Sequence, residues 1–135
     1  MEAKLPTEIL KKAFRASNGE LAWAKPDAVE AATALAAHGM AILGGEVWSI
    51  QEGGRWQGLI PQTDGSPDSV YHWELEPQKA DSESWQTFCD RATRYAVSAL
   101  ESLNAERDVI PELRHRIRFN LTYVSQQEYQ NLKKP

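Results

Sequence analysis

The spacing of hydrophobic residues predicts helices in four parts of the chain. Apolar side chains recur at helical intervals over residues 7–17, 26–38 and, most clearly, 85–103, where polar residues occupy the opposite positions. Pro26 suits the first turn of a helix, and Asn18-Gly19 and Gly39 are typical of residues that follow helix ends. A short polar helix is expected over residues 125–133.

Strand patterns occupy most of the sequence between these helices. Residues 116–123 alternate strictly between apolar and polar side chains, as in a half-buried strand. Shorter runs over 40–51, 55–61 and 70–75 predict three more strands, the first with a bulge at Gly44-Gly45. The order α-α-β-β-β-α-β-α predicts an α+β fold, with a mostly antiparallel four-stranded sheet and helices packed on one face. A single domain over residues 1–135 is expected.

Composition narrows the class of protein. No apolar run approaches the length of about 20 residues that a membrane helix needs, so no membrane partner is expected. The first residues have neither an apolar segment nor a cleavage site, so we expect no secretory signal. Cys89 is the only cysteine, which excludes an intrachain disulfide and suits a reducing cytoplasm. The formal charge of −4 argues against general nucleic-acid binding.

The charge is unevenly distributed along the chain. Residues 62–90 hold seven acidic side chains and one lysine, whereas residues 107–118 hold four arginines and a histidine. Two explanations stay open: the two segments pair within the fold, or the acidic one steers a basic partner. Arg114, Arg116 and Arg118 are expected on one face of a strand. That face has no stacking aromatic residue, so RNA binding is not predicted.

Few residues suggest catalysis. His72 and Glu74 are two apart on a predicted strand and so share a face. A metal site needs a third ligand, and Glu46 cannot be placed because the strand register is unknown. Cys89 lies on the apolar stripe of its helix, which indicates a core thiol. No nucleotide loop, zinc spacing or catalytic triad is present, so neither catalytic residues nor a metal nor another cofactor are predicted.

Three tryptophans lie on the three consecutive predicted strands. Trp73 is expected to pack under the helices. Trp48 and Trp56 lie close to each other across a predicted hairpin and are flanked by polar and charged residues. Either both fill the core, or one of them is a partly exposed anchor for a basic partner, since tryptophan is enriched at interface hot spots.

The chain resembles a known class of proteins. Residues 5–10, and residues 28–43 running directly into Gly44-Gly45-Glu46-Val47-Trp48, are similar to small α+β immunity proteins of bacterial polymorphic toxin systems, as is the later strand with Trp73. The resemblance implies a cytoplasmic bacterial protein that is encoded beside a toxin and blocks the toxin's active domain without catalysis.

We therefore predict an immunity-type protein that neutralises a cognate toxin domain through an acidic face containing aromatic residues. The predicted interface residues are Glu46, Trp48, Trp56, Asp64, Asp68, His72, Glu74 and Glu76. Two alternatives stay open: a general protein-binding adaptor or regulatory module, and a small enzyme that uses His72 and Glu74.

Overall fold

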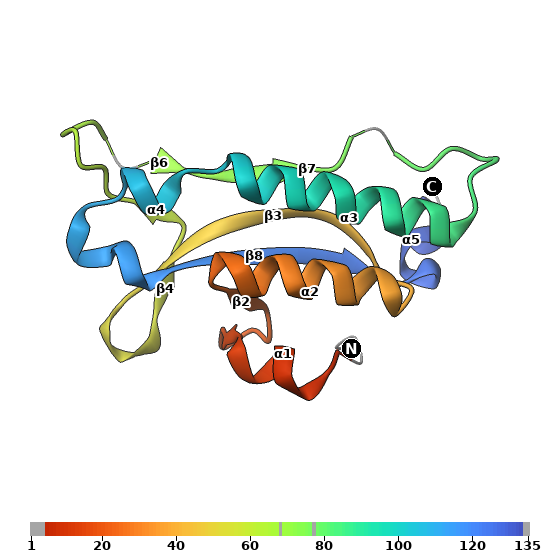
Figure 1. Ribbon diagram of the computed structural model, residues 1–135, viewed down its shortest axis with the longest axis horizontal. Helices are drawn as coiled ribbons and strands as arrows, with labels where there is room; N and C mark the ends of the chain where they lie inside the picture. Colours follow the sequence, from red (N-terminus) through yellow and green to blue (C-terminus); the bar gives the residue numbers. More distant parts are fainter. Residues whose placement is uncertain (1–4, 68, 77, 134–135) are drawn as a thin grey trace.

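Figure 1 shows the computed structural model, in which residues 5–67, 69–76 and 78–133 are described. Their elements in chain order are α1 (Thr7–Lys12), β1 (Phe14–Arg15), β2 (Leu21–Trp23), α2 (Lys25–Ala37), β3 (Ala41–Ile50), the 3-10 turn η1 (Glu52–Gly54), β4 (Trp56–Gln57), β5 (Leu59–Ile60), β6 (Ser69–Val70), β7 (His72–Glu74), α3 (Trp85–Ser102), α4 (Ala105–Asp108), the 3-10 helix η2 (Pro111–Arg116), β8 (Ile117–Val124) and α5 (Gln126–Lys133). The α+β class is confirmed.

The main sheet has six strands in the order β1-β2-β8-β3-β4, with β7 also paired to β3. β4 and β7 pair with different parts of β3, on the side of β3 that faces away from β8. They therefore occupy one position in the strand order, and the sheet is five strands wide. It curls into a half-barrel, so the expectation of a four-stranded sheet is wrong. All the pairings of described residues are antiparallel. β5 and β6 form a separate two-stranded sheet.

The two strands that the sequence did not indicate are β1 and β2. They form a hairpin in which Gly19 has a φ of 90°, a conformation that glycine adopts without steric cost. β2 is buried along its whole length, so it has no alternation of apolar and polar residues to detect. It pairs with β8, which is thereby enclosed between β2 and β3 at the centre of the sheet.

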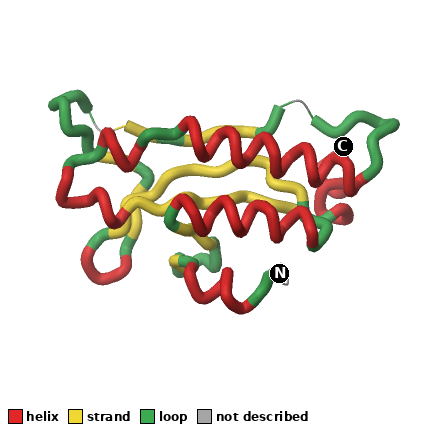
Figure 2. The backbone as a smooth tube through the Cα atoms, viewed as in Figure 1, coloured by secondary structure: helices red, strands yellow, loops and turns green. Residues whose placement is uncertain are grey.

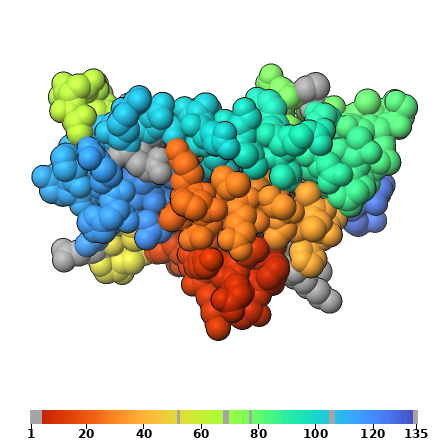
Figure 3. Space-filling model, viewed as in Figure 1, coloured from red at the N-terminus to blue at the C-terminus, as the bar shows by residue number. Residues whose placement is uncertain are grey.

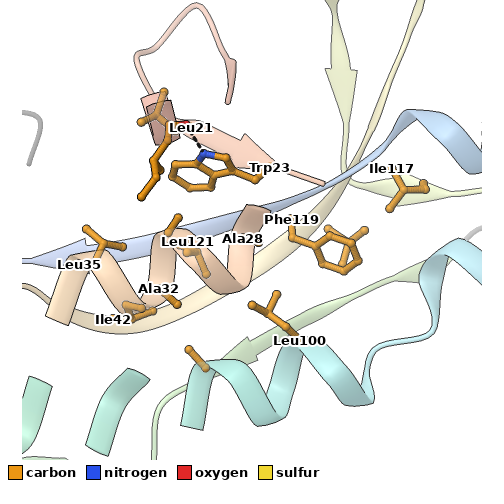
Figure 4. Close-up of a cluster of buried hydrophobic side chains, with 14 of the residues drawn as sticks. Leu21, Trp23, Ala28, Ala32, Leu35, Ile42, Leu100, Ile117, Phe119 and Leu121 are labelled. Atoms are coloured by element: carbon orange, nitrogen blue, oxygen red, sulfur yellow. Dashed lines mark hydrogen bonds between the residues drawn. The ribbon is translucent and has the colours of Figure 1, made fainter. Parts of the chain in front are cut away.

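The two long helices α2 and α3 lie side by side over one face of the sheet (Figures 1 and 2). In the space-filling view they form a continuous layer over the strands (Figure 3). Small alanines on α2 allow close packing, and α3 contributes larger residues such as Phe88 and Leu100. Figure 4 shows Trp23, Phe119 and Leu121 from the strands within the same core, where the Trp23 indole donates to the Ile9 carbonyl at 3.0 Å.

Local sequence explains where α3 begins. The Ser84 hydroxyl accepts a hydrogen bond from the Thr87 backbone amide, so Ser84 is the N-cap of this helix. Cys89 on this helix is fully buried, as predicted, and burial raises the pKa of its thiol to about 11. The thiol therefore stays protonated and unreactive at neutral pH.

Helix α5 is fixed against the end of the sheet. Ser125 and Glu128 form a reciprocal capping box: each side chain accepts a hydrogen bond from the other's backbone amide. The hydrogen bond from the Ser125 amide to the Glu128 carboxylate is the main cause of the lowered pKa of Glu128, and the Ser125 hydroxyl lowers that pKa further. Tyr129 is buried against Phe88 and Trp85, with ring centroids 5.2 and 5.6 Å apart. The start of α5 is thus held firmly where β8 ends.

Candidate partner-binding site

Gly44 and Gly45 are required by close packing at the start of β3. A Cβ atom at Gly45 would lie 2.3 Å from the Asn120 carbonyl oxygen and 2.9 Å from the Trp73 indole nitrogen. One at Gly44 would lie 2.6 Å from the Trp73 carbonyl oxygen. The register also shifts between Ile42 and Gly44, as the predicted bulge requires. The two glycines therefore allow β7 and β8 to approach β3 closely.

Strand register then assembles a polar group on the opposite face of the sheet from α2 and α3, which we call the open face. Glu46 is paired with His72 on β7 and with Asn120 on β8, while Gly44 is paired with Glu74 and Thr122. Paired residues on neighbouring strands point to the same face. His72 and Glu74 thus share a face, as predicted, and Glu46 joins them.

These residues line a groove of about 640 Å³. Its floor is the open face around Gly44, Glu46 and Asn120, and α5 contributes Tyr129, Leu132 and Lys133 to its lining. Glu20, from the β1–β2 hairpin, lies among the lining residues. Because Gly44 has no side chain, the sheet is hollow at this point.

The charge in the groove is negative. Glu74 and His72 are exposed, and no described residue forms a hydrogen bond or ion pair with either side chain. Glu46 is half-buried, and its Oε1 accepts the Trp48 indole hydrogen bond at 2.7 Å. The ammonium group of Lys133 is engaged by Gln78 Oε1 and lies 5.3 Å from the Tyr129 ring centroid.

The tryptophans fill the other end of the open face. Trp48 is fully buried, stacked on Trp56 with ring centroids 4.1 Å apart and touched edge-on by Phe14 at 6.1 Å. Phe14 and Ala16 from the N-terminal hairpin cover Trp48 in this structure, and its contact with a partner stays a prediction. Trp56 is half-buried and remains a candidate for the partly exposed anchor.

Two further acidic residues of the predicted interface, Glu76 and Asp64, do not line the groove. Glu76 is exposed just beyond β7. Asp64 lies in the loop before β6, at the opposite end of the molecule from α5 (Figure 1). The Asp64 carboxylate accepts hydrogen bonds from the Ser66 hydroxyl and amide, which lower its pKa. Asp68 lies outside the described residues.

Other predicted chemistry can be placed in the same way. Among the described residues, no three histidine, cysteine or carboxylate side chains come together as metal ligands. The expected row of arginines on one strand face is wrong, because Arg114 and Arg116 belong to η2 and only Arg118 lies on β8. No described helix is long and apolar enough to span a membrane.

Sequence reasoning missed Glu20, Asn120 and the α5 residues as neighbours of His72. Asn120 was detectable as a polar position of the alternating β8 pattern, but nothing local shows that β8 lies next to β3. The position of Glu20 depends on the β1–β2 hairpin, which carries no periodic signal.

The comparisons with known proteins define a class: the chain matches a family of immunity proteins over residues 13–114. This match covers most of the chain, which therefore belongs to the immunity protein 40 family, and the resemblance noted from the sequence is confirmed. No curated protein and no solved structure matches the chain. The matched segment ends before β8, although β8 is the central strand of the sheet.

Proposed function

We propose that this protein binds a cognate bacterial toxin domain in a stoichiometric complex and neutralises it, without catalysis, through the open face of its sheet. Membership of an immunity protein family implies a toxin partner. The single observation that carries the choice of surface is the strand register, which gathers Glu46, His72 and Glu74 around a groove.

Physical chemistry favours this face over the helix-covered one. Between α2, α3 and the sheet the surfaces are already packed against each other, whereas the groove has unpaired charge and hollow shape. A negative patch accelerates association with a positively charged partner and discriminates against acidic proteins. Exposed Glu76 and half-buried Trp56 extend this surface in the proposal. The complex would form in the cytoplasm of the toxin-producing cell.

The test is co-expression with the toxin domain encoded beside the gene. Wild-type protein is expected to restore growth and to co-purify with the toxin in equal amounts. Glu74→Lys reverses a groove charge and is expected to weaken protection. The matched control is Glu101→Lys, which makes the same charge change at an exposed position on α3. Failure of the wild-type protein to bind or protect would refute the proposal, and equal loss in both variants would refute the choice of face.

A further inference from the structure

Unused hydrogen-bond acceptors line the groove. The Glu74 carboxylate has no partner among the described residues, and Glu46 uses only Oε1, in its bond to Trp48. By the strand register, Glu46 and Glu74 are diagonal neighbours on β3 and β7, a relation that places Cβ atoms about 7–8 Å apart.

Asn120 points to the kind of group that would occupy the groove. Its side chain is almost entirely buried, with 3% of the residue exposed, and its Nδ2 donates to the Leu21 carbonyl at 2.9 Å. No described residue donates to its Oδ1. Every fully buried side-chain nitrogen or oxygen of the described chain has a partner, so Oδ1 must retain some accessible surface. Because Asn120 lines the groove, this carbonyl is an acceptor that a donor entering the groove can reach.

The protein's own cation does not supply that donor. Lys133 is held by Gln78 and the Tyr129 ring at the wall of the groove. The other donors of the groove lining, which include the His72 ring and the Thr122 and Tyr129 hydroxyls, do not donate to Asn120 Oδ1 either. The groove therefore combines surplus negative charge with an accessible acceptor in its floor that has no donor among the described residues.

We propose that the groove receives an arginine side chain of the toxin domain, an inference that rests on the proposed function. A guanidinium group has a fixed planar set of five N–H donors, enough to engage separate acceptors on Glu46, Glu74 and Asn120 at once. The aliphatic stem of arginine packs well on apolar surface while its head stays polar. Leu132, which is 66% exposed, offers such a surface in the groove wall.

The first experiment measures the affinity of the complex with the toxin domain encoded beside the gene. Glu74→Gln and Glu46→Gln remove one charge each, and the glutamine carbonyl can still accept the Trp48 indole bond. Each is expected to weaken binding roughly 10- to 100-fold, mainly through faster dissociation. Glu101→Gln on α3 is the matched control and is expected to bind as wild type.

An arginine-to-alanine scan of the toxin then identifies the inserted residue. For one arginine, substitution by alanine is expected to cost little further binding affinity when the immunity protein carries Glu74→Gln, because the two substitutions remove the same contact. Replacing that arginine by lysine is expected to recover only part of the affinity. Tight binding by both glutamine variants, while the wild-type protein still neutralises the toxin, would overturn the arginine assignment and leave the proposed function standing.

A second measurement does not need the toxin. In an NMR titration of the free protein, N-acetyl-arginine methylamide is expected to cause saturable shifts of the Gly44 and Gly45 backbone amide signals and of the Asn120 side-chain amide signal. The Glu74→Gln substitution is expected to abolish this response. The neutral isostere N-acetyl-citrulline methylamide is the control. Equal shifts with the citrulline compound or with N-acetyl-lysine methylamide would overturn the assignment. The absence of a saturable shift with the arginine compound would overturn it as well. A wild-type protein that responds here but does not bind the toxin would contradict only the proposed function.

Discussion

The two ends of β3 on the open face of the sheet differ in how their space is used. At the Gly44–Glu46 end the sheet is hollow, and the exposed side chains of His72 and Glu74 have no partner among the described residues. At the Trp48–Ile50 end, stacked tryptophans and Phe14 fill the surface completely enough to bury Trp48. One strand therefore contributes to stability at one end and to the proposed binding surface at the other. Residue type alone does not distinguish them, because tryptophan is common in both roles.

The two ends are also coupled. Glu46 belongs to the groove, but its Oε1 accepts the Trp48 indole hydrogen bond that fixes the first aromatic ring of the stack. The remaining oxygen of the same carboxylate is thus held in place by the filled end. Such support from a neighbouring rigid element is what a precise binding site requires.

The largest expected effect on stability comes from truncating the buried tryptophan at the Trp48–Ile50 end of β3. Trp48→Ala removes a fully buried indole and is expected to lower the free energy of unfolding by about 4 kcal/mol, measured by urea denaturation. Trp48→Phe keeps part of the packing and should cost less. Trp56→Ala, at a half-buried position, should cost about 2 kcal/mol. If Trp56→Ala proved as harmful as Trp48→Ala, the contrast between a buried and a partly exposed ring would be lost.

The next effect tests the close approach at the hollow end. Gly45→Ala places a methyl group against the Asn120 carbonyl and the Trp73 indole, and we expect a loss of about 3 kcal/mol in unfolding free energy. Gly58→Ala is the control, since a Cβ there meets no atom within 4 Å. Similar denaturation midpoints for the two variants would show that the strands can separate without cost.

A smaller effect on stability is expected at the N-terminus of α5, the helix that contributes to the groove lining. Ser125→Ala removes the N-cap of α5 and is expected to cost about 1 kcal/mol of stability at neutral pH. The pKa of Glu128 is lowered in the folded protein, so its stabilisation is present above the ordinary carboxyl pKa and is lost as pH falls through the lowered value. Urea denaturation of Glu128→Gln should therefore approach that of the wild type in acid. A difference that grew in acid would contradict this sign.

The smallest effect is expected in the exposed loop between β5 and β6, which does not line the groove. Asp64→Lys alters an exposed loop at the opposite end of the molecule from the groove and should change stability and toxin affinity by about 0.5 kcal/mol or less. Calorimetric titration beside Glu74→Lys provides the comparison. A loss for Asp64→Lys as large as for Glu74→Lys would show that the acidic interface extends along the whole molecule.

Long periodic segments were predictable from the sequence, and short ones were not. The patterns for α2, α3 and β8 are each eight residues or longer and predicted the right element at the right place. β1 and β2 contain two and three residues, too few to show a period, so the β1–β2 hairpin was missed. The sequence left the burial of Trp48 open for the same reason, because Phe14 and Ala16 of that hairpin cover it.

The candidate site was predictable only within one strand. The period of two placed His72 and Glu74 on a common face, but their position beside Glu46 and Asn120 depends on pairing with strands that are distant in sequence. Such register is set by the whole sheet and by the Gly44-Gly45 bulge, not by local residues. The tie between Glu46 and Trp48 likewise depends on the rotamers that tertiary packing selects.

The central position of β8 has a consequence for protein synthesis. A ribosome makes β2 and β3 before β8, and β2 is not joined to β3 until β8 emerges to pair with both. Contacts between residues so far apart in sequence form late and slowly. The nascent chain therefore has no groove floor while Asn120 and Thr122 are untranslated, and the proposed toxin-binding surface is complete only after that strand has left the exit tunnel.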